Sequence, residues 1–196
     1  MRVGALQLLY TVYMARILKA RFFNRPAPVV AKELLGKFLI RRHEGREIAA
    51  LITETEAYEG PRDKASHASR GKTARNAVMF GPPGRWYVYF TYGMHWMLNV
   101  VTGKKGYPAA VLLRGIDGAN GPARLTKLLG IDRNLNGKPA VKASGLWIED
   151  GGVVIPKKHI LSGPRVGVAY AGRYWAGRKY RFYLVKTILS HDRKIG

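Results

Sequence analysis

The sequence predicts a single α+β domain, built on a curved, mostly antiparallel sheet with a few short helices and a projecting β-hairpin. Several short segments alternate apolar and polar residues between glycine- and proline-rich turns, which is the pattern of strands joined by short connections. Helical patterns are few and short. The chain has 196 residues, 47% of them hydrophobic, so it is the size of one domain with ample apolar surface for a packed core.

The chain carries a large excess of positive charge. Lys and Arg number 34 and Asp and Glu number 12, giving a formal net charge of +22. This balance predicts a polyanionic partner. Nucleic acid is the leading candidate and an anionic membrane surface the second, because the basic residues are spread between strands and do not lie on one amphipathic helix. The absence of cysteine excludes disulfides, cysteine-ligated zinc, iron–sulfur clusters and thiol catalysis.

The N-terminus contains a mostly apolar run at residues 3–14. It is a poor signal peptide, because basic residues follow at once without a small-residue cleavage site, and it is too short to span a bilayer. One interpretation is that Met14 is an alternative start and residues 1–13 are an appendage. The other is a short helix that packs on the domain.

The first regular elements are a short helix at residues 25–36 and a strand at 37–42. Prolines open the helical segment, Val30 and Leu34 lie four residues apart, and Gly36 ends it. Residues 43–46 then turn the chain back, which predicts an antiparallel strand pair.

Two carboxylates end the second strand of this pair, predicted at residues 48–58. Strict alternation places Glu54, Glu56 and Tyr58 on the same face as the apolar residues before them. A carboxylate withdrawn from water is costly unless it is paired or hydrogen-bonded, so this face is the candidate active site. The Cα atoms of Glu54 and Glu56 would be about 6.6 Å apart, which also fits the paired acids of an O-glycoside hydrolase.

A long polar loop at residues 59–83 and a β-hairpin follow. Loops of this length in compact domains are usually functional or disordered. Residues 86–91 and 96–101 alternate between an apolar face and a face of aromatics with an amide. Tyr92, beside a glycine at the tip of the turn, is expected to project from the hairpin.

The remainder predicts one more helix and a series of strands. The helix starts at Gly121 and Pro122 and carries Leu125, Leu128 and Leu129. The strands are predicted at residues 109–114, 144–149, 153–155, 166–170 and 180–184.

Metal sites are not supported by the spacing of candidate ligands. Asp132, Asn134 and Asn136 begin a calcium-loop pattern, but Ala143 stands where the bidentate glutamate belongs. Three further residues match no established spacing: Glu56, Asp63 and His67. We expect neither a metal nor a cofactor.

An ordered series of residues runs from Glu54 to Phe182, within a stretch from about residue 18 to residue 185 that follows one family pattern. It comprises Glu54, Glu56, Ala57, Tyr58, Gly60, Pro61, Asp63, Ala65, His67, Thr73, Arg75, Asn76, Met79, Phe80, Pro83, Gly84, Tyr87, Tyr89, Tyr92, Gly93, Met94, Asn99, Leu112, Arg114, Gly121, Pro122, Leu125, Arg165, Val166, Gly167, Arg181 and Phe182. Together these residues resemble the 3-methyladenine (alkyladenine) DNA glycosylase family. The series departs from the family at residues 171–176, where arginine and tyrosine replace an acidic segment.

The resemblance implies a monofunctional DNA repair glycosylase. Such an enzyme flips damaged purines, alkylated or deaminated, out of duplex DNA and hydrolyses the N-glycosidic bond, leaving an abasic site. Glu56 is implied as the general base that activates a water, and Arg114 and the backbone of Val166 as groups that help to hold it. Glu54 is then structural.

The resemblance also assigns the base pocket and a wedge. The pocket that stacks on the flipped base is implied to contain Tyr58, His67 and Tyr89. Asn99 is implied to discriminate against normal guanine, and Tyr92 to wedge into the minor groove where the base has left.

The implied organisation is an N-terminal appendage at residues 1–17, with an upstream extension before Met14, followed by a glycosylase domain at 18–196. The expected partner is double-stranded DNA containing damaged purines. The protein is expected to bind it as a monomer, and no membrane partner is expected. The expected location is the cytoplasm or nucleoid, or the nucleus in a eukaryote. Two alternatives remain open: an O-glycoside hydrolase using Glu54 and Glu56, and a non-catalytic basic RNA-binding protein.

Overall fold

The structure, a computed structural model, describes residues 15–185. The apolar run at residues 3–14 and the alternative start at Met14 lie outside the described residues. The described end of the predicted appendage at residues 1–17 joins the sheet, since β1 (Arg16–Ile17) pairs antiparallel with β8 (Leu146–Asp150). Among residues 15–185, no helix is long and apolar enough to cross a membrane.

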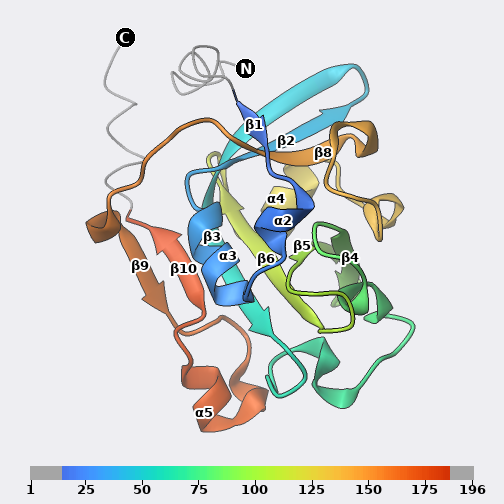
Figure 1. The fold of residues 1–196 in the computed structure, drawn as a ribbon, viewed down its shortest axis with the longest axis vertical. Coiled ribbons are helices and arrows are strands. Elements are labelled where there is room, and N and C mark those ends of the chain that lie inside the picture. Colours follow the sequence, from blue (N-terminus) through green and yellow to red (C-terminus); the bar gives the residue numbers. More distant parts are fainter. Residues whose placement is uncertain (1–14, 186–196) are drawn as a thin grey trace.

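Within the described range, an open antiparallel sheet of ten strands forms the body of the domain (Figure 1). The paired strands run in the order β1-β8-β2-β3-β6-β5-β4, while β10 pairs with β3, β9 with β10 and β7 with β6. The other strands are β2 (Phe38–His43), β3 (Arg46–Glu59), β4 (Trp86–Thr91), β5 (His95–Val101), β6 (Ala109–Ile116), β7 (Ala119–Asn120), β9 (Ile160–Gly163) and β10 (Arg181–Leu184). This confirms the predicted α+β domain.

Strand β3 changes partners along its length. Its first half pairs with β2, whereas its second half pairs with both β6 and β10. The register with β6 shifts between Ile52 and Glu54 and again between Glu54 and Thr55. Such bulges bend a strand and re-aim its side chains. Here they lie immediately before Glu56.

Short helices cover the sheet and fill its connections. The α-helices are α2 (Ala20–Phe23), α3 (Ala27–Leu34), α4 (Pro122–Leu128) and α5 (Gly172–Gly177). The 3-10 helices are η1 (His67–Arg70), η2 (Ala77–Phe80), η3 (Arg133–Leu135), η4 (Lys142–Ser144), η5 (Lys157–His159) and η6 (Ala169–Ala171). Helices α2 and α3 lie in front of the sheet in Figure 1.

Helix α3 confirms the prediction for residues 25–36. Val30 and Leu34 are fully buried. The helix stops before Gly36, whose φ is +81° and where a Cβ would lie 2.6 Å from the side chain of Ile155. Thr55 Oγ1 donates to the carbonyl of Ala31 at 2.8 Å, which fixes α3 on the face of β3 opposite Glu56.

The predicted β-hairpin is also present. Strands β4 and β5 pair antiparallel, with Trp86 and Leu98 fully buried in the main core. Their connection has positive φ at both Tyr92 (52°) and Gly93 (65°), the conformation of a type I′ turn. Tyr92 is 79% exposed, so it projects as predicted.

The loop at residues 59–83 is ordered by its own polar contacts. Asn76 is buried, and its amide nitrogen donates to the carbonyls of His67 and Gly71 while its amide oxygen accepts from the backbone of Thr73. These bonds fold the loop over η1 and hold His67 beside the hairpin.

Two predicted strands are wrong. Residues 153–155 form no strand, because the Val153 and Ile155 side chains instead pack against the turn at Gly36. Residues 166–170 form a turn leading into η6, because Gly167 adopts a φ of +74° that a strand does not allow. Strand β9 and helix α5 are absent from the sequence prediction.

Candidate active site

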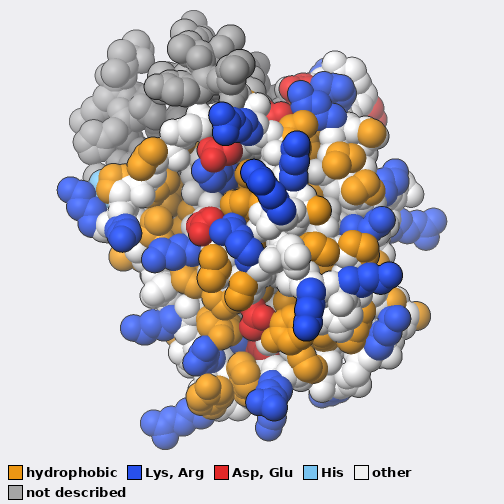
Figure 2. Space-filling view, viewed as in Figure 1, with side chains coloured by type: hydrophobic (Ala, Val, Ile, Leu, Met, Phe, Trp, Pro, Cys, Tyr) orange, Lys and Arg blue, Asp and Glu red, His pale blue; other side chains and the backbone are white. Residues whose placement is uncertain are grey.

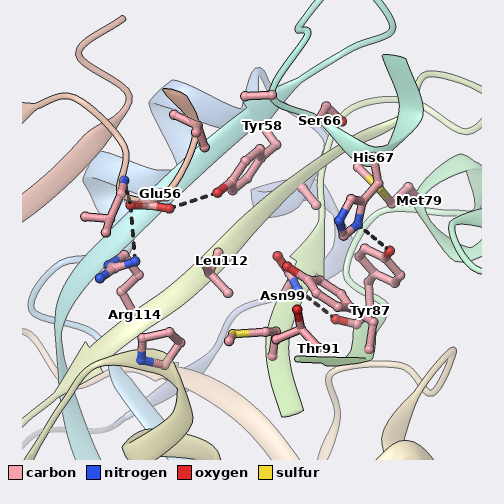
Figure 3. Close-up of a pocket in the computed structure, with 18 of the residues that line it drawn as sticks. Glu56, Tyr58, Ser66, His67, Met79, Tyr87, Thr91, Asn99, Leu112 and Arg114 are labelled. Atoms are coloured by element: carbon pink, nitrogen blue, oxygen red, sulfur yellow. Dashed lines mark hydrogen bonds and ion pairs between the residues drawn. The ribbon is translucent and has the colours of Figure 1, made fainter. Parts of the chain in front are cut away.

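A cavity of about 440 Å³ opens between β3, the β4–β5 hairpin, β6, η1 and the segment at residues 166–170. All eight site residues predicted from the sequence line it, and five of them are labelled in Figure 3. The eight are Glu56, Tyr58, His67, Tyr89, Tyr92, Asn99, Arg114 and Val166. The structure therefore brings together residues that are up to 110 positions apart in the chain.

Glu56 is fully buried at one end of the cavity and is held by three groups. Its Oε1 accepts from the backbone N–H of Val166 at 2.8 Å and lies 3.4 Å from Nη1 of Arg114, while its Oε2 accepts from the Tyr58 hydroxyl at 2.9 Å. Burial raises the pKa of Glu56 above its ordinary value, against the opposing effects of Arg114, the Val166 N–H and the Tyr58 hydroxyl. A buried carboxylate with a raised pKa is suited to accept a proton.

Glu54 has different surroundings. Its Oε1 accepts from Nε of Arg114 at 2.9 Å and from Nε of Arg181 at 2.6 Å, and Glu54 does not line the cavity. This ion-paired carboxylate fixes the side chain of Arg114, whose other nitrogen faces Glu56. The geometry thus gives the two acids of β3 different surroundings and does not set them as a facing pair across the cavity.

Aromatic rings form the wall of the cavity opposite Glu56. His67 Nδ1 lies 2.9 Å from the Tyr87 hydroxyl, and the His67 ring meets the Tyr89 ring edge-on with centroids 4.7 Å apart. Burial, and then the charge of Arg75, lower the pKa of His67, so its imidazole is neutral at pH 7. Burial raises the pKa of Tyr87 to about 12. The rings of this wall are therefore uncharged at pH 7, and they are tilted relative to one another.

Asn99 is 3% exposed and lies on β5 beside this wall. Its Nδ2 donates to the backbone carbonyl of Tyr87 at 3.0 Å. Because the amide nitrogen is held by β4, the amide group has a fixed orientation at the surface of the cavity (Figure 3).

The rim of the cavity is more exposed. Tyr92 stands there on the hairpin turn, and Val166 is 48% and Tyr170 69% exposed. Tyr170 is nevertheless anchored, since its hydroxyl donates to the carbonyl of Ala65 at 3.0 Å.

Several lining residues have no role in the sequence prediction. Tyr87 shares a strand face with Tyr89, so the alternation of the hairpin contains the signal that identifies it. Tyr170 could not be found, because it falls in the segment predicted as a strand. In the described residues, no three His, Asp or Glu side chains gather as a metal site; Asp63 is paired with Arg165 and His67 with Tyr87.

The chain is similar in sequence to known proteins over most of its length. The family model described as methylpurine-DNA glycosylase matches residues 21–187. A protein of Methanocella arvoryzae named "Putative 3-methyladenine DNA glycosylase" is 46% identical, with a match that covers 85% of this chain and 92% of that protein. Proteins of the same name from Anaeromyxobacter dehalogenans and Streptomyces avermitilis are 47% and 43% identical, covering 83% and 81% of this chain and 80% and 86% of theirs.

Proposed function

Because the chain belongs to the methylpurine-DNA glycosylase family, we propose that the cavity beside Glu56 receives a damaged purine flipped out of duplex DNA. The protein is a DNA repair enzyme that hydrolyses N-glycosidic bonds. The observation that supports the site assignment is the buried Glu56 carboxylate at the end of an aromatic cavity. The general test is release of free base from alkylated duplex DNA by the purified protein.

In the proposed reaction, Glu56 takes a proton from a water that attacks C1′ of the deoxyribose. A C1′–O bond forms as the C1′–N bond breaks, and the bonding electrons leave with the purine. Arg114 Nη1 and the Val166 N–H converge on Oε1 of Glu56, so a water held at this oxygen lies within their reach. None of the described residues that line the cavity is a lysine, which supports hydrolysis without a Schiff-base intermediate.

The aromatic wall would hold the flipped base. Tyr58 and Tyr89 offer faces for stacking, and base–aromatic stacking contributes about 1–3 kcal/mol per base. Neutral His67 adds a third ring without charge. A normal guanine carries an exocyclic amino group. Because the amide of Asn99 has a fixed orientation and cannot move away from this group, Asn99 would exclude guanine from the cavity.

The DNA partner also explains the charge of the chain. Figure 2 shows Lys and Arg side chains spread across the described part of the visible face, with few acids between them. We propose that a monomer binds double-stranded DNA mainly through its phosphates. An O-glycoside hydrolase would gain nothing from this charge on a neutral sugar, and an RNA-binding protein without chemistry would need no buried Glu56.

Duplex affinity should depend steeply on salt. Since each phosphate contact releases counterions, log K should fall linearly with log salt concentration, with a slope of about 0.9 per phosphate contacted. The slope is measured by fluorescence anisotropy with an undamaged duplex. Salt concentrations of about 50 to 200 mM cover the range over which such effects are large. A flat response would remove phosphate contacts as the basis of binding.

Tyr92→Ala should slow excision without weakening non-specific binding. The exposed ring contributes little to the fold, but as a wedge it would replace the stacking that the flipped nucleotide gives up. Unstacking costs a few kcal/mol, so single-turnover excision from paired duplex should slow by about 10- to 100-fold.

Two comparisons separate a wedge from other roles of Tyr92. Tyr92→Phe keeps the ring and should excise at a rate near that of the wild type. The Tyr92→Ala defect should shrink when the lesion is mispaired, because a destabilised base leaves the stack more easily. An equal loss on paired and mispaired substrates would mean that Tyr92 acts in folding or in the chemical step.

A further inference from the structure

A completely buried ion pair lies next to the Glu56 end of the cavity. Arg165 Nη1 and Nη2 donate to Oδ2 and Oδ1 of Asp63 at 2.5 and 2.8 Å, and both side chains are 0% exposed. A buried ion pair is weak evidence of stabilisation, because desolvation of both charges offsets their attraction. Its presence beside the site calls for another explanation.

Arg165 reaches Glu56 by two routes. It directly precedes Val166, whose N–H donates to Oε1 of Glu56. Its guanidinium also lies 4.8 Å from the centre of the Tyr58 ring, whose hydroxyl donates to Oε2. A further bond from Nη1 to the carbonyl of Ala57 at 2.9 Å fixes Arg165 to β3 between Glu56 and Tyr58.

Asp63 anchors the other side of the pair. Its Oδ2 accepts from the backbone of Glu59 and its Oδ1 from the backbone of Ala65, each at 3.1 Å. The carboxylate thus ties the loop that leaves β3 to the guanidinium, and Arg165 Nη2 continues to the carbonyl of Trp175 near the end of α5. Three segments distant in sequence meet at this pair.

We propose that Asp63 and Arg165 are positioning residues for the glycosylase reaction: the pair holds the Tyr58 hydroxyl and the Val166 N–H in place on Glu56. The inference rests on the proposed role of Glu56 as general base. Neither residue contacts the cavity, so both would act through the donors that they orient.

Loss of the pair should change the titration of Glu56. The charged or titratable groups that face this carboxylate are Glu54 and Tyr58 on β3, Arg114 on β6 and Tyr89 on β4. The Tyr58 and Val166 bonds both lower the pKa of Glu56 against the effect of burial. When these bonds loosen, the pKa rises further, and the pH at which the base becomes protonated and activity falls moves upward.

The test is the double variant Asp63→Asn/Arg165→Met. It removes both buried charges together, so no unpaired ion is left in the interior, and the asparagine can still accept from Ala65. Single-turnover base release is measured against pH on a methylated-purine duplex. The matched control is Arg41→Met, because Arg41 is also a buried arginine but donates to the carbonyls of Leu129, Gly130 and Gly145, far along the chain from Glu56.

We expect the double variant to be folded by circular dichroism and to release base about 100-fold more slowly, as for a catalytic group displaced by about 1 Å. On acidification it should lose activity at a higher pH than the wild type, whereas Arg41→Met should lose activity at the same pH as the wild type. A folded double variant with a wild-type rate, or with a slower rate but a wild-type pH for the loss of activity, would overturn the inference. If Glu56→Gln itself still released base, the proposed function would fail instead, independently of the ion pair.

Discussion

Glu56→Gln is expected to reduce base release by about 10²- to 10⁴-fold, the range of a general base lost from its reaction. An amide cannot take the proton from the attacking water. Binding should survive, because the phosphate contacts and the aromatic wall are unchanged. The measurements are single-turnover excision from a methylated-purine duplex and affinity for a duplex with an abasic-site analogue.

The variant should also remain folded. Its amide oxygen can accept from Val166 as Oε1 does, and its nitrogen can donate to the Tyr58 hydroxyl in place of the bond at Oε2. Because the folded-state pKa of Glu56 is raised, the folded protein loses stability as pH rises through the interval between the unfolded-state and folded-state pKa values of this group. At neutral pH the free energy of unfolding of the uncharged variant should therefore be at least that of the wild type.

Glu54→Gln is the matched control on the same strand. Its carboxylate pairs with Arg114 and Arg181 outside the cavity, so its loss should loosen Arg114 and cause a smaller defect. If Glu54→Gln alone abolished release while Glu56→Gln stayed active, the two carboxylates would have to exchange roles.

Arg165→Met is expected to destabilise the fold by about 3–5 kcal/mol, because it leaves the Asp63 carboxylate buried without its counter-ion. The double variant Asp63→Asn/Arg165→Met should recover much of this loss, since it leaves no buried charge. Urea unfolding of the wild type, both single variants and the double variant gives the coupling energy of the pair.

Arg41→Met again provides the comparison. Arg41 donates to backbone carbonyls, so its removal leaves no buried carboxylate and should cost less than Arg165→Met. A loss for Arg165→Met no larger than that for Arg41→Met, or additive effects at Asp63 and Arg165, would show that the pair is not coupled.

The sequence predicts those elements of the fold in which apolar and polar residues alternate regularly. Alternation identifies β3 and the β4–β5 hairpin, because their two faces meet different surroundings, with Trp86 in the core and Tyr89 in the cavity. The same rule fails at residues 166–170. A strand would place Val166, Val168 and Tyr170 on one face, but Val168 is buried while Val166 and Tyr170 are exposed, because the backbone turns at Gly167.

The candidate site was only partly predictable. Two acids on one face of a strand indicate that Glu54 and Glu56 are unusual, but the choice between them depends on neighbours contributed by other segments. Arg165 lies 102 residues from Asp63 and Val166 lies 110 from Glu56. Contacts over such separations arise from the path of the sheet and have no local signature in the chain. The resemblance to a family supplied the assignments of Glu56 and Val166, and the cavity brings these two together, but the resemblance gave no role to Asp63 or Arg165.

The turn at Tyr92 has a consequence for how the protein would search DNA. A tyrosine with φ of 52° sits in a sparsely populated conformation, and it is kept there by Gly93 and by the Met94 N–H bond to the carbonyl of Thr91 at 3.1 Å. The backbone that carries the ring is thus fixed during folding, and little backbone entropy is left to lose when DNA arrives. Under the proposed function, the hairpin tip would test each base step for weak stacking without waiting for a loop to close.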